Sequence, residues 1–321
     1  MRESCDAYIR DATERLSSSL RAVSSQEAAE AVLVTGKNLR SNLLIWASLL
    51  AGDQSRCPDE GVAARAAAVE LLHTASLLHD DIIDQAETRR GRSSLRYSGG
   101  DDVAQAAGST LVLDGCRLLE ADTAATRAAF AQTLGVMCIG ELRELEYSYD
   151  LTVTPDTAFE VNAKKTAALF ILVSTLGCRT TDRIEANAIA HFLRNFGYAF
   201  QLADDVADLV STGEESMKDV QADLAAGHYT LPVVFALKSG SPVRGDLAGL
   251  LGGPNVQPSD ATRAIGRILA STAIDDCFEL VDAFVDQSVS ALVSVFAVSA
   301  ARDEMCRLAI EIGKTLRGQR A

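Results

Sequence analysis

Two apolar segments of the chain carry the same acidic pattern, a pair of Asp residues followed three residues later by a third. Its six members are Asp80, Asp81 and Asp84 in the first copy and Asp204, Asp205 and Asp208 in the second. Residues three or four positions apart share one face of a helix, so each copy gathers three carboxylates on one side. Their mutual repulsion favours a bound cation, and Mg²⁺ is commonly held by one or two carboxylates together with substrate phosphates. The pattern therefore predicts metal sites for a diphosphate.

A single copy of this pattern has a plainer interpretation, the solvated face of an amphipathic helix. The repetition favours metal binding instead. So do the apolar neighbours, which include Leu77 and Leu78 before the first copy and Phe200 before the second. Acidic residues seldom lie among apolar ones without a partner.

Basic residues that suit phosphate flank the first copy. Lys37 and Arg40 are three positions apart, about one helical turn, and the pair Arg89-Arg90 begins five positions after Asp84. Arg matches phosphate oxygens in bidentate geometry, and Lys supplies a compact charge. The alternatives are that Arg89 and Arg90 stabilise the end of a helix, which favours cations, and that Lys37 and Arg40 form solvated surface.

The composition excludes some classes of function. The chain has 321 residues, of which 48% are hydrophobic and only 6 are Pro, and its formal net charge is −14. The acidic balance argues against a nucleic-acid partner, whose footprint is a basic patch. The 7 Cys residues form no C-x-x-C pair, which is typical of a reducing cytosol. We find no signal peptide and no uncharged stretch long enough to cross a bilayer, so we expect a cytoplasmic protein without a transmembrane segment.

Apolar residues recur at helical spacing along most of the chain. We expect helices over residues 5–23, 27–51, 60–86, 102–120, 124–149, 156–178, 183–210, 217–225, 229–239, 259–271, 273–300 and 302–317. Gly, Pro and Ser gather at 52–58, 91–100, 211–216 and 239–258, which predicts loops there. No β-hairpin pattern stands out. The sequence therefore predicts an all-α fold in a single domain over residues 1–321.

The order of the motifs resembles that of the trans-isoprenyl diphosphate synthases, the polyprenyl synthetase family. The matching segments, in order, are Gly36-Lys37-x-x-Arg40, His73 to Asp84, Arg89-Arg90-Gly91, Lys165-Thr166-Ala167, Gly197 to Asp208 and Asp223 to Pro232. The resemblance implies a bundle of mostly antiparallel helices around a deep central cavity, usually in a homodimer.

The resemblance also implies a role for each matching residue. The six Asp residues would hold about three Mg²⁺ ions on an allylic diphosphate. The residues that would contact this diphosphate or its metals are Arg89, Lys165, Gln201 and Lys218. Those that would bind isopentenyl diphosphate are Lys37, Arg40, His73 and Arg90. Thr166 would shape the surroundings of the carbocation, whereas His79 is expected to pack against its neighbours.

The implied reaction is the condensation of isopentenyl diphosphate with the allylic diphosphate. Mg²⁺ and cationic side chains would stabilise the charge that develops on the departing diphosphate. An apolar cavity would protect the carbocation from water. The double bond of isopentenyl diphosphate then attacks and a proton is lost, so no side-chain nucleophile is needed.

Small residues occupy the positions that commonly limit product length in this family. Ala75 and Ser76 lie five and four residues before Asp80, and Cys116 lies on the next expected helix. We therefore expect an open pocket and a product of geranylgeranyl diphosphate or longer. The deeper residues that could close this pocket are Phe130, Met137 and Phe170.

The chain departs from the family pattern at several positions. Thr35 and Ser41 replace the Gly and Pro of the first basic motif, and His228 replaces the Lys that commonly follows Gly227. One cationic contact thereby becomes dependent on pH or is lost.

Two other functions share part of this pattern. A class I terpene cyclase also ionises a diphosphate with Asp clusters and Mg²⁺, but it commonly lacks a fully aspartic second copy and needs no site for isopentenyl diphosphate. The other is a subunit of a heteromeric synthase. Regulatory subunits tend to lose Asp residues, whereas this chain keeps all six, so it would be the catalytic subunit.

Overall fold

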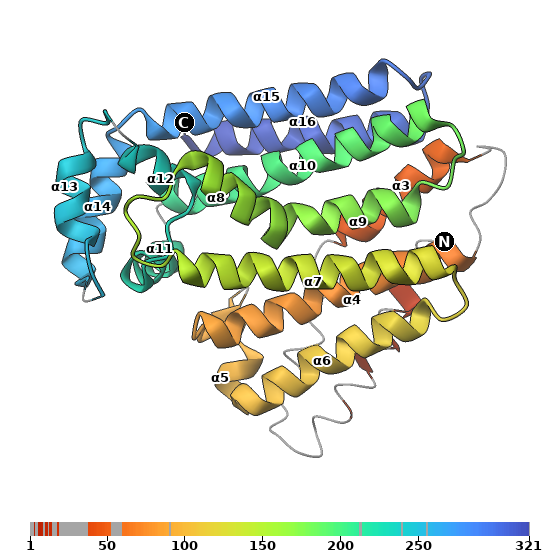
Figure 1. The fold of residues 1–321 in the computed structure, drawn as a ribbon, viewed down its shortest axis with the longest axis horizontal. Helices are drawn as coiled ribbons and strands as arrows, with labels where there is room; N and C mark the ends of the chain where they lie inside the picture. Colours follow the sequence, from red (N-terminus) through yellow and green to blue (C-terminus); the bar gives the residue numbers. More distant parts are fainter. Residues whose placement is uncertain are drawn as a thin grey trace. The chain divides into compact units, whose positions relative to one another are not determined.

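The computed structural model is built almost entirely of helices (Figure 1), which confirms the predicted all-α fold. It describes residues 38–52, 60–89, 91–211, 214–238, 240–254 and 256–320, together with scattered residues between positions 3 and 18. Within these ranges, no helix is both long and apolar enough to cross a membrane.

The chain forms two compact units. Unit 1 comprises residues 1–134 and 171–189, and unit 2 comprises residues 135–170 and 190–321. The first acidic copy belongs to unit 1 and the second to unit 2.

In unit 1, two long helices pack side by side and form much of the core. The elements of its first segment are α3 (Leu39–Ala51), α4 (Glu60–Ile83), β1 (Thr88–Arg89), β2 (Arg92–Ser93), α5 (Leu95–Gly99), α6 (Asp101–Leu118) and the start of α7 (Ala124–Glu146). Helices α4 and α6 lie side by side (Figure 1). Leu71, Ala75 and Leu78 of α4 form a buried cluster with residues of α6 such as Ala104 and Leu111. The small Ala side chains allow the two helices to approach closely.

Two short elements of unit 1 differ from the sequence prediction. The predicted loop over 91–100 contains α5, whose first turn is capped by the Ser94 hydroxyl as it accepts a hydrogen bond from the Tyr97 N–H at 3.0 Å. In addition, β1 and β2 form an antiparallel pair in which Arg89 lies opposite Arg92, although no hairpin was predicted. Strands of two residues are too short to show an alternating pattern.

Unit 2 contains the remaining helices. They are α8 (Pro155–Asn162), the π-helix η1 (Ala163–Ala167), α9 (Ala168–Gly177), α10 (Arg183–Val210), α11 (Glu214–Ala226), α12 (Leu231–Leu237), α13 (Arg244–Leu251), α14 (Pro258–Leu269), α15 (Ala273–Val293) and α16 (Ala300–Arg320), with parts of α9 and α10 in unit 1. Helix α13 lies inside the predicted loop over 239–258, and η1 interrupts the predicted helix over 156–178. Helices α15 and α16 lie side by side (Figure 1).

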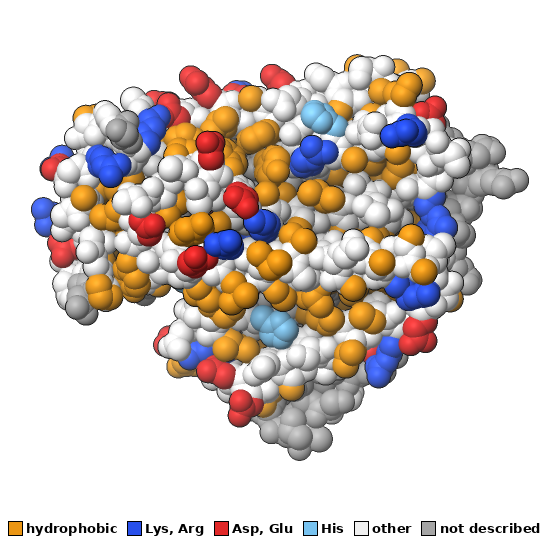
Figure 2. Space-filling model, in the orientation of Figure 1, with side chains coloured by type: hydrophobic (Ala, Val, Ile, Leu, Met, Phe, Trp, Pro, Cys, Tyr) orange, Lys and Arg blue, Asp and Glu red, His pale blue; other side chains and the backbone are white. Residues whose placement is uncertain are grey.

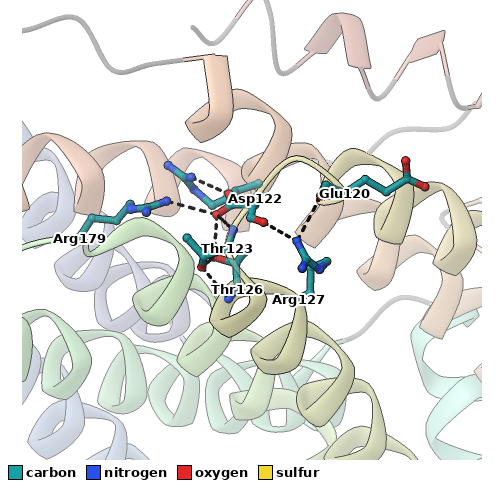
Figure 3. Close-up of polar contacts among 7 residues, drawn as sticks. Glu120, Asp122, Thr123, Thr126, Arg127 and Arg179 are labelled. Carbon is teal, nitrogen blue, oxygen red and sulfur yellow. Dashed lines mark hydrogen bonds and ion pairs between the residues drawn. The ribbon is translucent and has the colours of Figure 1, made fainter.

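An ion-pair network in unit 1 joins the segment before α7 to α4 (Figure 3). Asp122 accepts hydrogen bonds from Arg65 at 2.7 Å, from the Thr123 N–H at 2.7 Å and from the Thr126 hydroxyl at 2.8 Å. Arg179 lies 3.3 Å from the same carboxylate. Burial acts to raise the pKa of Asp122, but these hydrogen bonds outweigh it and lower the pKa to about 2.

We expect Asp122 to make the protein sensitive to acid. The folded pKa lies below the unfolded value of 3.8, so this stabilisation is complete above pH 4 and is lost as the pH falls through about 2. The shift corresponds to about 2 kcal/mol. Asp122→Asn should lack this component and should cost about 3 kcal/mol at pH 7, because Arg65 remains buried. Urea unfolding, monitored by circular dichroism, measures the free energy of unfolding of the wild type as the pH falls and that of the variant at pH 7.

Asp260→Asn is the matched control, because it removes a carboxylate from an ion pair with a largely exposed Arg263 at 3.2 Å. Its effect on the free energy of unfolding should stay below about 0.5 kcal/mol, both at pH 7 and at acid pH near 2. Equal losses for the two variants would contradict a specific role of Asp122.

Candidate active site

The first acidic copy lies near the end of α4, and its three carboxylates differ in burial. Asp80 is partly exposed on the same face of the helix as His73 and Ser76, and Asp84 is exposed at the end. Asp81 points the other way and is only 2% exposed. Two carboxylates are therefore accessible, and the one between them is buried.

The chain turns sharply after this copy. Gln85 has a φ of 56°, and the Ala86 N–H donates to the Asp81 carbonyl at 2.9 Å, as in a Schellman cap. The Ser94 hydroxyl donates to the Ala86 carbonyl at 2.6 Å, and the Ser94 N–H donates to the Glu87 carbonyl at 2.9 Å. These bonds fix the β1–β2 hairpin against the end of α4.

The hairpin carries Arg89 to Asp81. The guanidinium donates two hydrogen bonds to Asp81 Oδ1, from Nε at 2.8 Å and from Nη2. Burial raises the pKa of Asp81 in spite of this cation. The pKa of Arg89 is lowered by its own burial, but the charges of Asp81, Asp80 and Asp84 outweigh that effect and raise it. Arg89 is thus the counter-ion of the buried Asp81.

The second acidic copy lies on α10 and shows the same order of burial. Asp204 and Asp208 are exposed, and Asp205 is 8% exposed. Its partner is neutral, because the Gln201 amide donates to Asp205 Oδ1 at 2.8 Å. Burial raises the pKa of Asp205 to about 7; the Gln201 hydrogen bond opposes this, and nearby carboxylates, including Asp204, add to it. The two copies therefore differ in how their buried carboxylate is compensated.

A row of aromatic side chains precedes the second copy on α10. Phe192, Phe196 and Phe200 follow one another at intervals of four residues, with centroids 5.8 and 6.4 Å apart. Phe170 of α9 packs against Phe196 at 5.4 Å. Phe192 and Phe196 are buried and Phe200 is half-buried. Because Asp204 is the next residue in this series, the aromatic row of the core leads along α10 to the carboxylates.

Lys165 lies in η1, where the widened turn presents it to α7. Its ammonium pairs with Glu141 at 3.0 Å and also with Glu144. Gly140 allows this close approach, since a Cβ there would lie 2.6 Å from the Lys165 backbone nitrogen. A π-turn at such a position is typical of functional sites. Thr166, the next residue, is half-buried.

Of the other basic residues predicted to bind substrate, the structure describes only some. Arg40, which we expected to bind isopentenyl diphosphate, is buried in the first turn of α3, and this burial excludes the alternative that it forms solvated surface. Lys37, Arg90 and the side chain of Lys218 lie outside the described residues.

The three residues predicted to line the chain-length pocket all lie in unit 1 and differ in burial. Ala75 is buried in the cluster between α4 and α6, and Cys116 is exposed on α6. Ser76 is half-buried, and its hydroxyl donates to the His73 carbonyl at 2.9 Å. The pocket role of Ala75, Ser76 and Cys116 therefore stays a prediction.

The deeper residues Phe130, Met137 and Phe170 are all buried. Phe130 packs against Gly115, where an added Cβ would lie 3.0 Å from the ring. His79 packs against Gly108 of α6, with Nε2 3.4 Å from the Gln105 carbonyl, which confirms its predicted structural role.

The donor set suits a hard divalent cation. All six candidate ligands are carboxylates. A bound cation would offset the free-energy cost of the buried negative charge of Asp205. Among the described residues, no group of three or more Asp, Glu, His or Cys side chains is already arranged to hold a metal.

Comparisons with known proteins show the family to which the chain belongs. The sequence matches the polyprenyl synthetase family over residues 23–268. It is 30% identical over 252 residues to component 2 of heptaprenyl diphosphate synthase from Geobacillus stearothermophilus, covering 78% of each chain. It is 33% identical over 246 residues to a short chain isoprenyl diphosphate synthase from Methanothermobacter thermautotrophicus, covering 73% of this chain and 74% of that one.

A solved structure is also similar over nearly the whole chain. It is a polyprenyl synthase from Caulobacter crescentus in complex with calcium and isoprenyl diphosphate, with a TM-score of 0.83, 26% identity and coverage of 97% of this chain and 94% of that one. Because the family match covers most of the chain and the fold agrees, the protein belongs to the polyprenyl synthetase family and is a prenyl diphosphate synthase.

Proposed function

We propose that this protein condenses isopentenyl diphosphate with an allylic diphosphate to give geranylgeranyl diphosphate or a longer product. The observation that carries the proposal is the pair of aspartic motifs, each with a buried central carboxylate, Asp81 or Asp205, between two more accessible ones. Asp81 is compensated by Arg89, whereas the partner of Asp205 is the neutral Gln201 amide. Mg²⁺ bound together with a diphosphate would supply the positive charge that the second motif lacks.

Both motifs serve the allylic diphosphate through Mg²⁺, about three ions in this proposal. Mg²⁺ held by these carboxylates would supply positive charge to the diphosphate that leaves the allyl group. Arg89, Lys165, Gln201 and Lys218 assist at this diphosphate, and Lys37, Arg40, His73 and Arg90 bind isopentenyl diphosphate. Phe200, the half-buried end of the aromatic row, lies one helical turn before the second motif, and such apolar, water-poor surroundings would protect the carbocation.

The proposed product length rests on the small residues before the first motif. Ala75 and Ser76 lie within about one helical turn of Asp80, and neither carries an aromatic ring. Incubation of the purified protein with Mg²⁺, radiolabelled isopentenyl diphosphate and farnesyl diphosphate should give labelled products of C20 or longer. A second incubation uses geranyl diphosphate as the allylic substrate. Accumulation of farnesyl diphosphate as its end product would contradict the proposed length. A cyclic hydrocarbon made from farnesyl diphosphate alone, detected by mass spectrometry, would indicate a terpene cyclase instead.

We further propose a homodimer that acts in the cytoplasm. The described cysteines are free thiols, which suits a reducing compartment. Helix α7 exposes four large apolar side chains, Val136, Ile139, Leu142 and Leu145. Figure 2 shows hydrophobic side chains at the surface along this helix. An apolar stripe at helical spacing favours pairing with the same helix of a second copy.

Leu142→Glu tests the proposed interface. We expect the wild-type protein to have twice the mass of the chain in light scattering and the variant to be largely monomeric, because a charge in an apolar interface is unfavourable. Ile184→Glu is the control, since Ile184 is equally exposed but lies on α10. The relative from Geobacillus is named as one component of a synthase. A monomeric wild type that becomes active only with a second protein would favour a heteromer.

A further inference from the structure

The first turn of α3 is held by a residue of another helix. The N–H groups in the first turn of a helix have no partner within that helix. The residue before α3, Asn38, makes no capping bond through its side chain, and the first turn contains no acidic residue. Instead, the Glu70 carboxylate of α4 accepts a hydrogen bond from the Ser41 N–H at 2.8 Å. Glu70 therefore caps α3 from the neighbouring helix.

Glu70 is a buried carboxylate, since only 7% of the residue is exposed. A buried negative charge is unfavourable unless hydrogen bonds and positive charge compensate it. The Ser41 N–H supplies one such bond, and the positive end of the α3 dipole lies at the same place. The interaction therefore ties the middle of α4 to the beginning of α3, two helices that pack against each other in unit 1.

This contact joins the segments of two residues that the proposed function assigns to isopentenyl diphosphate. Arg40 directly precedes Ser41 and is itself buried, with 8% of the residue exposed. His73 is half-buried and follows Glu70 by three positions, so the two lie on the same side of α4. Because little of the Arg40 side chain can reach a ligand, the placement of the first turn of α3 decides where its charge is presented.

We propose that Glu70 is a positioning residue for isopentenyl diphosphate, which fixes the first turn of α3 and thereby holds Arg40 on the side of α4 that carries His73. This inference rests on the proposed function. Glu70 does not bind the substrate itself, because its carboxylate is buried and has the same sign of charge as a diphosphate. Its effect is therefore specific to one substrate, since the allylic diphosphate is assigned to the aspartic motifs.

The test compares the Michaelis constants of the two substrates, each measured at a saturating concentration of the other. Glu70→Ala should raise KM for isopentenyl diphosphate about 10- to 30-fold, while kcat and KM for farnesyl diphosphate stay within about threefold of the wild type. Glu70→Gln keeps an oxygen that can accept the bond from Ser41 and should raise the same KM only about 3- to 5-fold. This milder variant carries the test if Glu70→Ala does not fold.

Glu185→Ala is the matched control. Glu185 also lies in the first turn of a helix, α10, and accepts a hydrogen bond from the Thr180 hydroxyl at 2.9 Å. Its removal should leave both Michaelis constants within about twofold of the wild type. Thermal unfolding of the variants separates a loss of stability, which either substitution can cause, from a selective change in one Michaelis constant.

Two substitutions of Ser41 isolate the hydrogen bond. Ser41→Ala removes the hydroxyl, which donates to the Asn38 carbonyl at 2.9 Å, but it keeps the N–H that donates to Glu70. Ser41→Pro removes both donors at a position in the first helical turn, where Pro is tolerated. KM for isopentenyl diphosphate should therefore be at least about threefold higher in Ser41→Pro than in Ser41→Ala.

Two outcomes would overturn the inference. If the Glu70 variants change both Michaelis constants equally, or if Ser41→Pro behaves as Ser41→Ala does, Glu70 contributes to stability alone, although the proposed function still stands. If the wild type does not condense the two substrates, the proposed function fails together with the inference.

Discussion

Asp205→Asn is expected to lower kcat/KM for condensation by at least about 10³-fold while leaving the protein as stable as the wild type or more stable. Asn keeps an oxygen that can accept the hydrogen bond from Gln201, but it cannot serve as an anionic metal ligand. It also removes a charge from a site where only 8% of the residue is exposed and where burial raises the pKa of the carboxyl to about 7. At pH 8 the gain in stability should be about 1–3 kcal/mol.

Asp81→Asn is the informative comparison. It should lower activity as strongly, but it should not stabilise the protein, because it takes the negative charge away from Arg89. Turnover of labelled isopentenyl diphosphate and urea unfolding at pH 8 give the two quantities. Retention of more than about a tenth of wild-type activity in Asp205→Asn would argue against a metal-binding role for this residue.

Gly140→Ala is expected to have the second largest effect, a loss of about 3 kcal/mol in stability and about 10²-fold in activity. The added methyl group would lie 2.6 Å from the backbone nitrogen of Lys165 and 2.9 Å from the carbonyl carbon of Lys164. Both neighbours are backbone atoms and cannot rotate away. Helix α7 and η1 must therefore separate, which moves the Lys165 ammonium from its present position.

Gly266→Ala is the control for this substitution. Gly266 is an exposed residue inside α14, and an added Cβ there meets nothing within 4 Å. Ala should stabilise the protein by about 0.5–1 kcal/mol, since it has the higher helix propensity. Thermal unfolding and the condensation assay compare the two variants. A neutral effect of Gly140→Ala on both would show that η1 does not depend on close packing against α7.

Local patterns made most of the fold predictable. Long amphipathic helices such as α6 and α10 lie where apolar residues recur at helical spacing. The short helices α5 and α13 were missed because Gly, Ser and Pro crowd the segments around them, and a capping residue such as Ser94 is a weak signal by itself.

The candidate site was predictable only in part, for a different reason. The clustering of each aspartic copy follows from helical spacing alone. Which of the three carboxylates is buried, and which side chain compensates it, depends on packing between elements. Asp81 and Arg89 are brought together by a hairpin whose two-residue strands leave no pattern in the sequence, and the partners of Lys165 are more than twenty residues away on α7.

The π-turn of η1 has a consequence for comparing this chain with its relatives. A π-turn holds one more residue than an α-turn, so the segment is equivalent to an insertion of a single amino acid in a continuous helix. If the residue positions from α8 to α9 are counted as one α-helix, the predicted direction of each side chain after η1 is in error by about 100°, the rotation of one residue. A relative that lacks one residue here could keep both flanking helices unchanged and still turn the residue aligned with Lys165 away from Glu141 and Glu144. An alignment gap of one residue at this place would thus signal a different orientation of the lysine, even where the lysine itself is present.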